Sequence, residues 1–102
     1  MKKIINGKKY DTDTAKMVAY ACSTLGATDF AYWEETLFRK QTGEYFIYGY
    51  GGPMTKWAET ISQNCWGWGK GIAPLTVKQA MKWAENHVTA DEYERIFGEV
   101  EE

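Results

Sequence analysis

The chain begins with two short strand-like runs on either side of an Asn-Gly dipeptide. Residues 3–5 and 8–10 flank Asn6-Gly7, and this dipeptide readily adopts the positive φ angles that a two-residue turn requires. The sequence therefore predicts an N-terminal β-hairpin.

A helix is predicted next, because residues 11–14 offer several side-chain oxygens that can cap a helix N-terminus. Ala15, Val18, Ala19 and Cys22 follow at the i, i+3, i+4, i+7 spacing of an apolar helical stripe. Because these side chains are small, we expect the helix to lie close to a sheet, with the thiol of Cys22 buried.

From residue 33 the pattern becomes typical of strands. Residues 33–40 and 44–50 are rich in aromatic and β-branched side chains, and residues 41–43 (QTG) favour a turn between them. We expect this hairpin at the centre of a small sheet with both faces partly covered. The predicted faces are Phe38 and Ile47 on one side, and Leu37, Phe46 and Tyr48 on the other.

The glycine-rich residues 49–53 are expected to end this strand. Beyond them we predict a short helix over residues 54–61 and a loop over residues 63–71. A short strand is expected over residues 71–74.

Two helices are predicted at the C-terminal end. Thr76 and Gln79 have the spacing of a capping box, and Thr89 is a second N-cap candidate. Gly98 ends the helical pattern, which leaves residues 99–102 as a frayed acidic tail. The apolar stripes of the two helices consist of Ala80, Trp83, Ala84 and His87, and of Tyr93, Ile96 and Phe97.

The predicted order of elements is ββαββ-β-αα, in which hairpins dominate over β-α-β units. The sequence therefore predicts a single α+β domain over residues 1–102. Its expected architecture is a small antiparallel sheet built from hairpins, with helices packed on one side.

The composition draws attention to aromatic side chains. They form 16% of the 102 residues, with five Trp and seven Tyr, and a core of this size encloses roughly half of such a set. Exposed Trp and Tyr are typical anchors of binding surfaces, so we predict a partner-binding surface near the glycine-rich segments. An alternative is that Trp66 or Trp68 folds back as a lid over a thin core. The predicted partner-binding residues are Tyr48, Tyr50, Trp57, Trp66, Trp68 and Lys70.

The charge is nearly balanced, with a net value of −2. This is too little positive charge for a general binder of phosphate backbones. Residues 2–16 are basic and residues 91–102 are acidic, which suits electrostatic steering toward a partner or simply two solvated faces. The first residues are charged, and no stretch is long and apolar enough to span a membrane. Together with two cysteines and no disulfide framework, this predicts a soluble, cytoplasmic protein.

The usual constellations of metal and nucleophile chemistry are missing from the sequence. His87 is expected to be a half-buried packing residue on a helix. Cys22 and Cys65 lack the short spacing of a zinc site. A pairing of Cys22 with His87 as nucleophile and base is disfavoured, because Cys22 belongs to the apolar stripe.

Acid–base and nucleotide chemistry are equally disfavoured. Glu34 and Glu35 are adjacent on a predicted strand and point to opposite faces, so they cannot act together on one substrate. The glycines around Lys70 lack the Ser or Thr that must follow in a P-loop. We therefore predict a protein that is not an enzyme and that needs no cofactor or metal.

Seven segments of the chain together have the pattern of a known group of small proteins. They are residues 2–15 (KKIINGKKYDTDTA), 34–37 (EETL), 42–46 (TGEYF), 51–54 (GGPM), 74–76 (PLT), 82–85 (KWAE) and 91–99 (DEYERIFGE).

With these segments the chain resembles a family carried by phages, plasmids and conjugative elements of Gram-positive bacteria. The group is similar to anti-CRISPR inhibitors of type II effector nucleases. The resemblance spans nearly the whole chain, with interruptions at residues 20–31 and 62–70, and it implies no catalytic motif.

The resemblance implies a counter-defence protein that binds a CRISPR effector nuclease in the host cell and blocks it without turnover. An alternative from the residues is a nucleic-acid-binding accessory protein. In that hypothesis, Trp66 and Trp68 stack on single-stranded bases, and Lys8, Lys9 and Lys70 contact phosphates. A homodimer that buries the aromatic surface is a further alternative.

Overall fold

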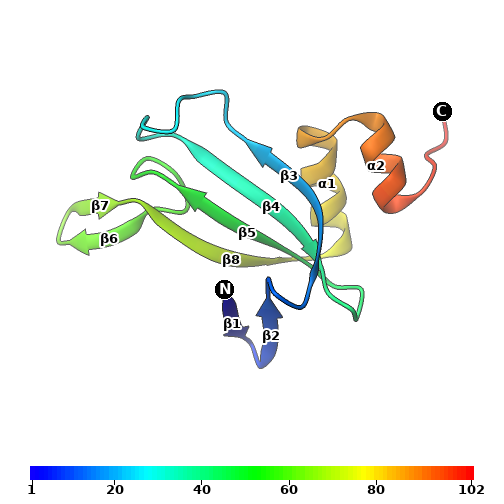
Figure 1. Ribbon diagram of the computed structural model, residues 1–102, viewed down its shortest axis with the longest axis horizontal. Helices are drawn as coiled ribbons and strands as arrows, with labels where there is room; N and C mark the ends of the chain where they lie inside the picture. Colours follow the sequence, from blue (N-terminus) through cyan, green and yellow to red (C-terminus); the bar gives the residue numbers. More distant parts are fainter.

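The computed structural model describes residues 1–102 and contains eight strands followed by two helices (Figure 1). Strands β3, β4, β5 and β8 form one antiparallel sheet in that order, while β1–β2 and β6–β7 are separate hairpins. Both helices pack against the same side of the sheet, so the predicted α+β class and architecture are confirmed. Neither helix has the length and apolar character needed to cross a membrane. The element bounds are β1 Lys2–Ile5, β2 Lys8–Asp11, β3 Lys16–Cys22, β4 Trp33–Arg39, β5 Tyr45–Gly51, β6 Glu59–Ser62, β7 Cys65–Gly67, β8 Gly69–Leu75, α1 Val77–His87 and α2 Ala90–Phe97.

The N-terminal hairpin is confirmed. Strands β1 and β2 pair with Ile5 opposite Lys8, so two residues form the turn. Asn6 has φ 51° and Gly7 has φ 77°, the left-handed values that a turn of this length demands.

The helix predicted after residue 14 is wrong, because that segment forms strand β3. The carboxylate of Asp11 accepts a hydrogen bond from the backbone N–H of Asp13 at 2.9 Å and closes a turn rather than starting a helix. Alternate small residues, Ala19 and Ala21, are buried in the core on the helix side, whereas Cys22 is exposed. Small apolar residues fit both periods here, and pairing with the edge of β4 decides in favour of the strand.

The central hairpin of β4 and β5 is confirmed, but the predicted faces are wrong. Phe38 lies directly opposite Phe46, and Leu37 lies opposite Ile47. Partners in an antiparallel ladder share a face, so Leu37 and Ile47 point to the helices, while Phe38, Phe46 and Tyr48 point away. The length of the connecting turn sets this register, and a shift of one residue exchanges the faces.

The segment from residue 54 to 71 also differs from the prediction. It contains a turn, the β6–β7 hairpin and the start of β8 instead of a helix and a loop. The reason lies in four glycines that the sequence pattern marks as breaks. Gly49 pairs with Gly71 and Gly51 pairs with Gly69, and all four point to the helix side. Trp57 lies on this glycine shelf, where a Cβ atom on Gly49 would clash with its indole.

Both C-terminal helices form as predicted. The Thr76 hydroxyl accepts from the Gln79 backbone N–H at 3.1 Å, and the Gln79 side chain accepts from the Thr76 N–H at 2.9 Å. Thr89 caps α2 by accepting from the backbone N–H of Glu92 at 3.2 Å. Gly98 ends α2 with φ 99°.

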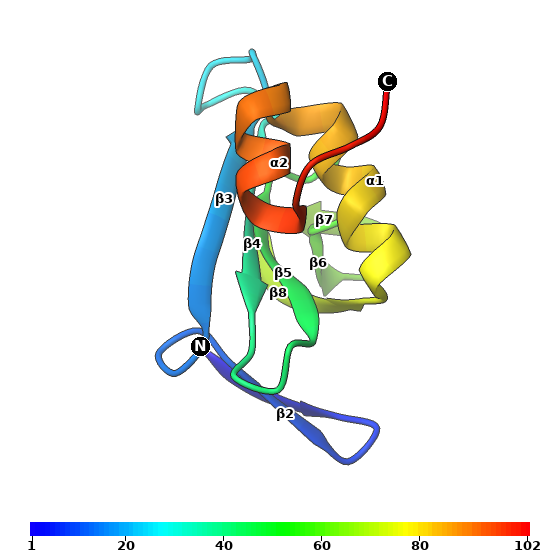
Figure 2. The ribbon, with the colours of Figure 1, turned by 90° about the vertical axis from the view of Figure 1, so that its right-hand side faces the viewer.

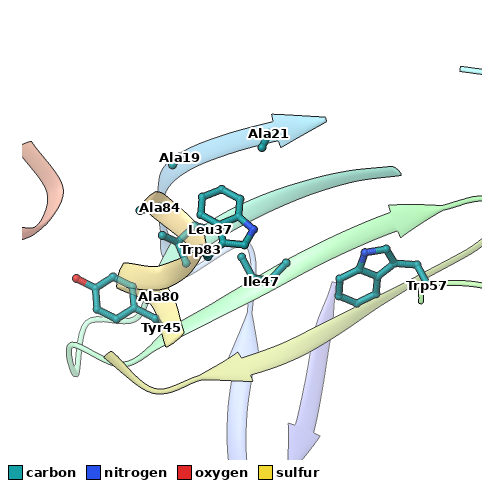
Figure 3. Packing of buried hydrophobic residues seen from close by; sticks show 9 residues of the cluster. All are labelled: Ala19, Ala21, Leu37, Tyr45, Ile47, Trp57, Ala80, Trp83 and Ala84. Carbon is teal, nitrogen blue, oxygen red and sulfur yellow. The ribbon is translucent and has the colours of Figure 1, made fainter. Parts of the chain in front are cut away.

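The sheet therefore has a core on each side, but the two differ in extent. On the helix side, Leu37 and Ile47 pack with Ala80, Trp83 and Ala84 of α1 (Figure 3). On the other side the N-terminal hairpin, at the bottom of Figure 2, covers one end of the sheet. There Tyr10 meets Phe46 edge to face, and Phe38 and Phe46 stack.

Candidate functional site

The end of the sheet beyond the N-terminal hairpin is uncovered on the side away from the helices. Cross-strand pairing aligns Glu34, Tyr50 and Lys70 in one row and Tyr20, Thr36, Tyr48 and Ile72 in the next. Tyr20 on the edge strand β3 is 51% exposed, and Tyr50 on the central strand β5 is 36% exposed, so both rings are accessible to a partner. We call this surface the open aromatic face, and it consists of Tyr20, Tyr32, Glu34, Tyr48, Tyr50, Trp68 and Lys70.

The centre of the open aromatic face is a stacked pair of rings. Tyr50 on β5 and Trp68, just before β8, have centroids 5.6 Å apart and planes inclined by 23°. Glu34 flanks Tyr50 on the β4 side and Lys70 flanks it on the β8 side. A flat aromatic surface thus lies between a negative and a positive charge.

Two phenols hold the Glu34 carboxylate in place. Tyr32 donates a hydrogen bond to its Oε2 at 2.8 Å, and Tyr20 donates to the same oxygen at 3.3 Å. The hydrogen bond to Glu34 raises the pKa of Tyr32 well above its usual range, and partial burial together with the Glu34 charge raises the pKa of Tyr20. Tyrosines are protonated at neutral pH in any case, and these upward shifts extend the donation to the carboxylate to higher pH.

The structure brings four of the six predicted partner-binding residues together. Tyr48, Tyr50, Trp68 and Lys70 share the open aromatic face. Trp66 is 54% exposed on β7, outside this face, so it does not act as a lid over the core.

Trp57 requires a correction. It is only 8% exposed and belongs to the core on the helix side, so it is unavailable as a surface anchor. Its position beside a glycine-rich segment predicts an exposed ring, but the glycine shelf on β5 and β8 gives the ring a place to pack.

Sequence reasoning missed Tyr20, Tyr32 and Glu34 as parts of this surface. The predicted helix includes Tyr20, so it does not place this residue opposite Thr36 on a neighbouring strand. Adjacency with Glu35 says nothing about which side chains meet the Glu34 carboxylate. The local signal in the sequence is that Ala19 and Ala21 alternate with Tyr20 and Cys22, the period of two that is typical of a strand.

A second polar site lies on the opposite side of the same strand. Glu35 is 5% exposed, and its carboxylate accepts from the indole N–H of Trp83 at 2.8 Å and from that of Trp57 at 2.9 Å. The Lys56 ammonium lies 3.2 Å from its Oε2. Glu34 and Glu35 thus point to opposite faces, as the sequence predicts.

A pocket of about 400 Å³ opens above Glu35. Its walls include Trp33, Trp57, Trp83 and His87. The ring of His87 lies 5.3 Å from that of Trp33 and 5.0 Å from that of Trp83, measured between centroids. His87 is exposed at the rim of this pocket, so the prediction of a half-buried packing residue is wrong.

The remaining candidates for chemistry are dispersed. No three His, Cys, Asp or Glu side chains lie close enough together to hold a metal ion. Cys22 and Cys65 are both exposed and are not joined to each other. Comparison of the chain with protein-family models, with curated proteins and with solved structures finds no match.

Proposed function

We propose that this protein is a non-catalytic inhibitor that binds its partner through the open aromatic face. The observation that supports this most directly is the stacked, partly exposed pair Tyr50 and Trp68 at the uncovered end of the sheet. Large rings with polar edges contribute most of the free energy in many protein interfaces, and they lose little side-chain entropy on binding.

The rigidity of the surface supports the same proposal. Tyr48 and Tyr50 lie on β5, a central strand paired along its whole length with β4 and β8. The partner therefore meets a surface that is already ordered, and less free energy is lost on association. Glu34 and Lys70 add charges of opposite sign that fix the orientation of the partner.

The resemblance in the sequence supplies the class of partner. We propose a counter-defence protein of a mobile genetic element, an anti-CRISPR protein that binds a type II CRISPR effector nuclease in the cytoplasm of the host bacterium. Inhibition then results from steric or allosteric blockade, with neither turnover nor a cofactor.

The direct test mixes the purified protein with a type II effector nuclease loaded with its guide RNA. We expect a complex that co-elutes in size-exclusion chromatography and a loss of DNA cleavage at stoichiometric amounts. Full cleavage at a large molar excess of the protein would contradict the proposal for that nuclease class.

One observation favours a second candidate, a nucleic-acid-binding accessory protein. The Tyr50–Trp68 stack lies beside Lys70, and such a platform also stacks on single-stranded bases. The negative charge of Glu34 on the same surface would repel a phosphate backbone, so we rank this candidate second. A mobility-shift assay at low salt separates the two, because the inhibitor proposal expects no shift of single-stranded DNA or RNA.

A further inference from the structure

The pocket above Glu35 places a buried carboxylate at the base of an opening to solvent. Burial of a carboxylate is costly unless donors and a counter-charge compensate it. Two indole N–H groups, from Trp57 and Trp83, supply uncharged donors, one to each oxygen. Figure 3 shows these two rings on the same side of the sheet.

The counter-charge of Glu35 is weakly held. It is the ammonium of Lys56, 3.2 Å from Oε2, on a side chain that is itself 68% exposed. Because this ammonium is solvated and its long side chain loses entropy when it is fixed, another cation can replace it and still supply the counter-charge. A carboxylate has about four acceptor positions, and Glu35 uses three of them.

The walls of the pocket also suit a cation. The Lys56 ammonium lies 5.2 Å from the centroid of the Trp57 ring, within the range of a cation–π contact. Trp33 and His87 form a further aromatic wall. The position of the Lys56 ammonium indicates that the pocket accommodates a cation between the Glu35 carboxylate and the Trp57 indole.

We propose that this pocket binds an organic cation, the guanidinium of an arginine or the ammonium of a lysine, in place of Lys56. The volume of about 400 Å³ is within the range of sites that take small ligands. The pocket lies on the helix side of the sheet, whereas the open aromatic face lies on the other, so this inference is independent of the proposed partner.

The test uses the indole N–H signals in ¹H–¹⁵N NMR spectra of the full chain, titrated with N-acetyl-arginine amide and N-acetyl-lysine amide. We expect saturable shifts of the signals of Trp57 and Trp83 and none for the exposed Trp66. N-acetyl-glutamine amide, which is neutral, is the control and is expected to cause no shift. Titration to about 50 mM detects dissociation constants in the millimolar range.

Two substitutions sharpen the test. Lys56→Met removes the competing ammonium, so the affinity for N-acetyl-arginine amide should rise by up to about fivefold. Lys78→Met, on an exposed lysine of α1, is the matched control and should leave the affinity unchanged. Glu35→Gln should abolish binding, provided that its indole signals remain dispersed as in a folded protein.

Equal binding of the neutral probe, or no shift of either indole with both cations, overturns the proposal. An affinity that Lys56→Met leaves unchanged also overturns it, when the indole signals of that variant remain dispersed as in a folded protein. Tyr50→Ala should not affect this titration, because Tyr50 lies on the other side of the sheet. The cation site is therefore tested independently of the proposed binding role of the open aromatic face.

A capped peptide with one arginine is compared with N-acetyl-arginine amide to identify the source of the cation. Tighter binding of the peptide identifies a protein segment, and equal affinities of the two probes identify a free small cation. Both results support the site.

Discussion

Glu34 and Glu35 are neighbours of identical chemistry, yet they lie on opposite faces of β4 in opposite environments. Glu35 is buried on the helix side, where two indoles and one ammonium satisfy it. Glu34 is half-buried on the open aromatic face, where two phenols donate to one of its oxygens. The comparison teaches that one strand can give a face that packs against the helices and stabilises the fold, and an opposite face that remains uncovered.

The same division extends across the sheet. On the helix side the glycines of β5 and β8 admit Trp57, and α1 covers the rest. On the other side the alternate residues of the same strands are Tyr48, Tyr50 and Lys70, and the N-terminal hairpin covers only the far end. Glycines and tyrosines therefore alternate along β5. The glycines make room for Trp57 on the helix side, and the tyrosines form part of the open aromatic face on the other.

The largest expected effect on stability is the difference between removing the Glu35 carboxylate and removing the Glu34 carboxylate. Glu35→Ala leaves two buried indole N–H groups without an acceptor and should lower the free energy of unfolding by about 3 kcal/mol. Glu34→Ala on the open face should lower it by less than about 1 kcal/mol. Urea denaturation of the two variants measures both values. Equal losses would show that the two faces do not differ as described.

The next effect concerns the glycine shelf. Gly49→Ala forces a Cβ atom into the Trp57 ring and should cost about 2 kcal/mol of stability. Gly71→Ala is the matched control on the paired strand, because its Cβ would meet Trp57 at an ordinary contact distance of 3.6 Å. We expect that variant to stay within about 0.5 kcal/mol of the wild type. Thermal unfolding of the pair checks this, and a Gly49→Ala protein as stable as Gly71→Ala would refute the packing of Trp57.

The smallest expected effect concerns how the N-terminal hairpin is held on the side of the sheet away from the helices. There the hairpin covers one end of the sheet, and the open aromatic face lies at the other end. Hydrogen bonds from Lys8, Thr42 and Lys40 lower the pKa of Glu44 from its ordinary 4.5 to about 2. Because the folded-state pKa is the lower one, the stabilisation is complete above pH 4.5 and is lost as the pH falls toward 2. We expect acid in this window to loosen the N-terminal hairpin, which Lys8 connects to Glu44.

The measurement for this boundary is the melting temperature as a function of pH for the wild type and for Glu44→Gln. The variant lacks the titrating carboxyl group, so its profile should be flatter between pH 4.5 and 2. Parallel profiles would mean that this ion pair does not hold the hairpin.

Several features were predictable because they depend on a few neighbouring residues. Asn6-Gly7 predicts its turn, and Thr76 with Gln79 predicts the start of α1, since the interactions lie within four residues. The strand β3 was not predictable in this way, because its small residues fit a helix equally well until β4 pairs with them.

The candidate site was predictable only in part for the same physical reason. Tyr48, Tyr50, Trp68 and Lys70 stand out as aromatic and basic residues near glycines. Trp57, by contrast, packs on the helix side of the sheet and not on the open aromatic face. Its place there depends on the register between β5 and β8, because this register aligns the glycines on which the ring lies. That Tyr20 and Tyr32 meet Glu34 likewise depends on the fold of the chain between them.

The central claim is that the open aromatic face binds the partner, and a titration of the guide-loaded nuclease tests it most directly. Wild type, Tyr50→Ala and Val77→Ala are compared, where Val77 is an apolar residue on α1 that is 53% exposed, more than the 36% of Tyr50. We predict that Tyr50→Ala binds at least about tenfold more weakly, while Val77→Ala binds as the wild type does. Binding of a folded Tyr50→Ala protein with unchanged affinity would contradict the claim.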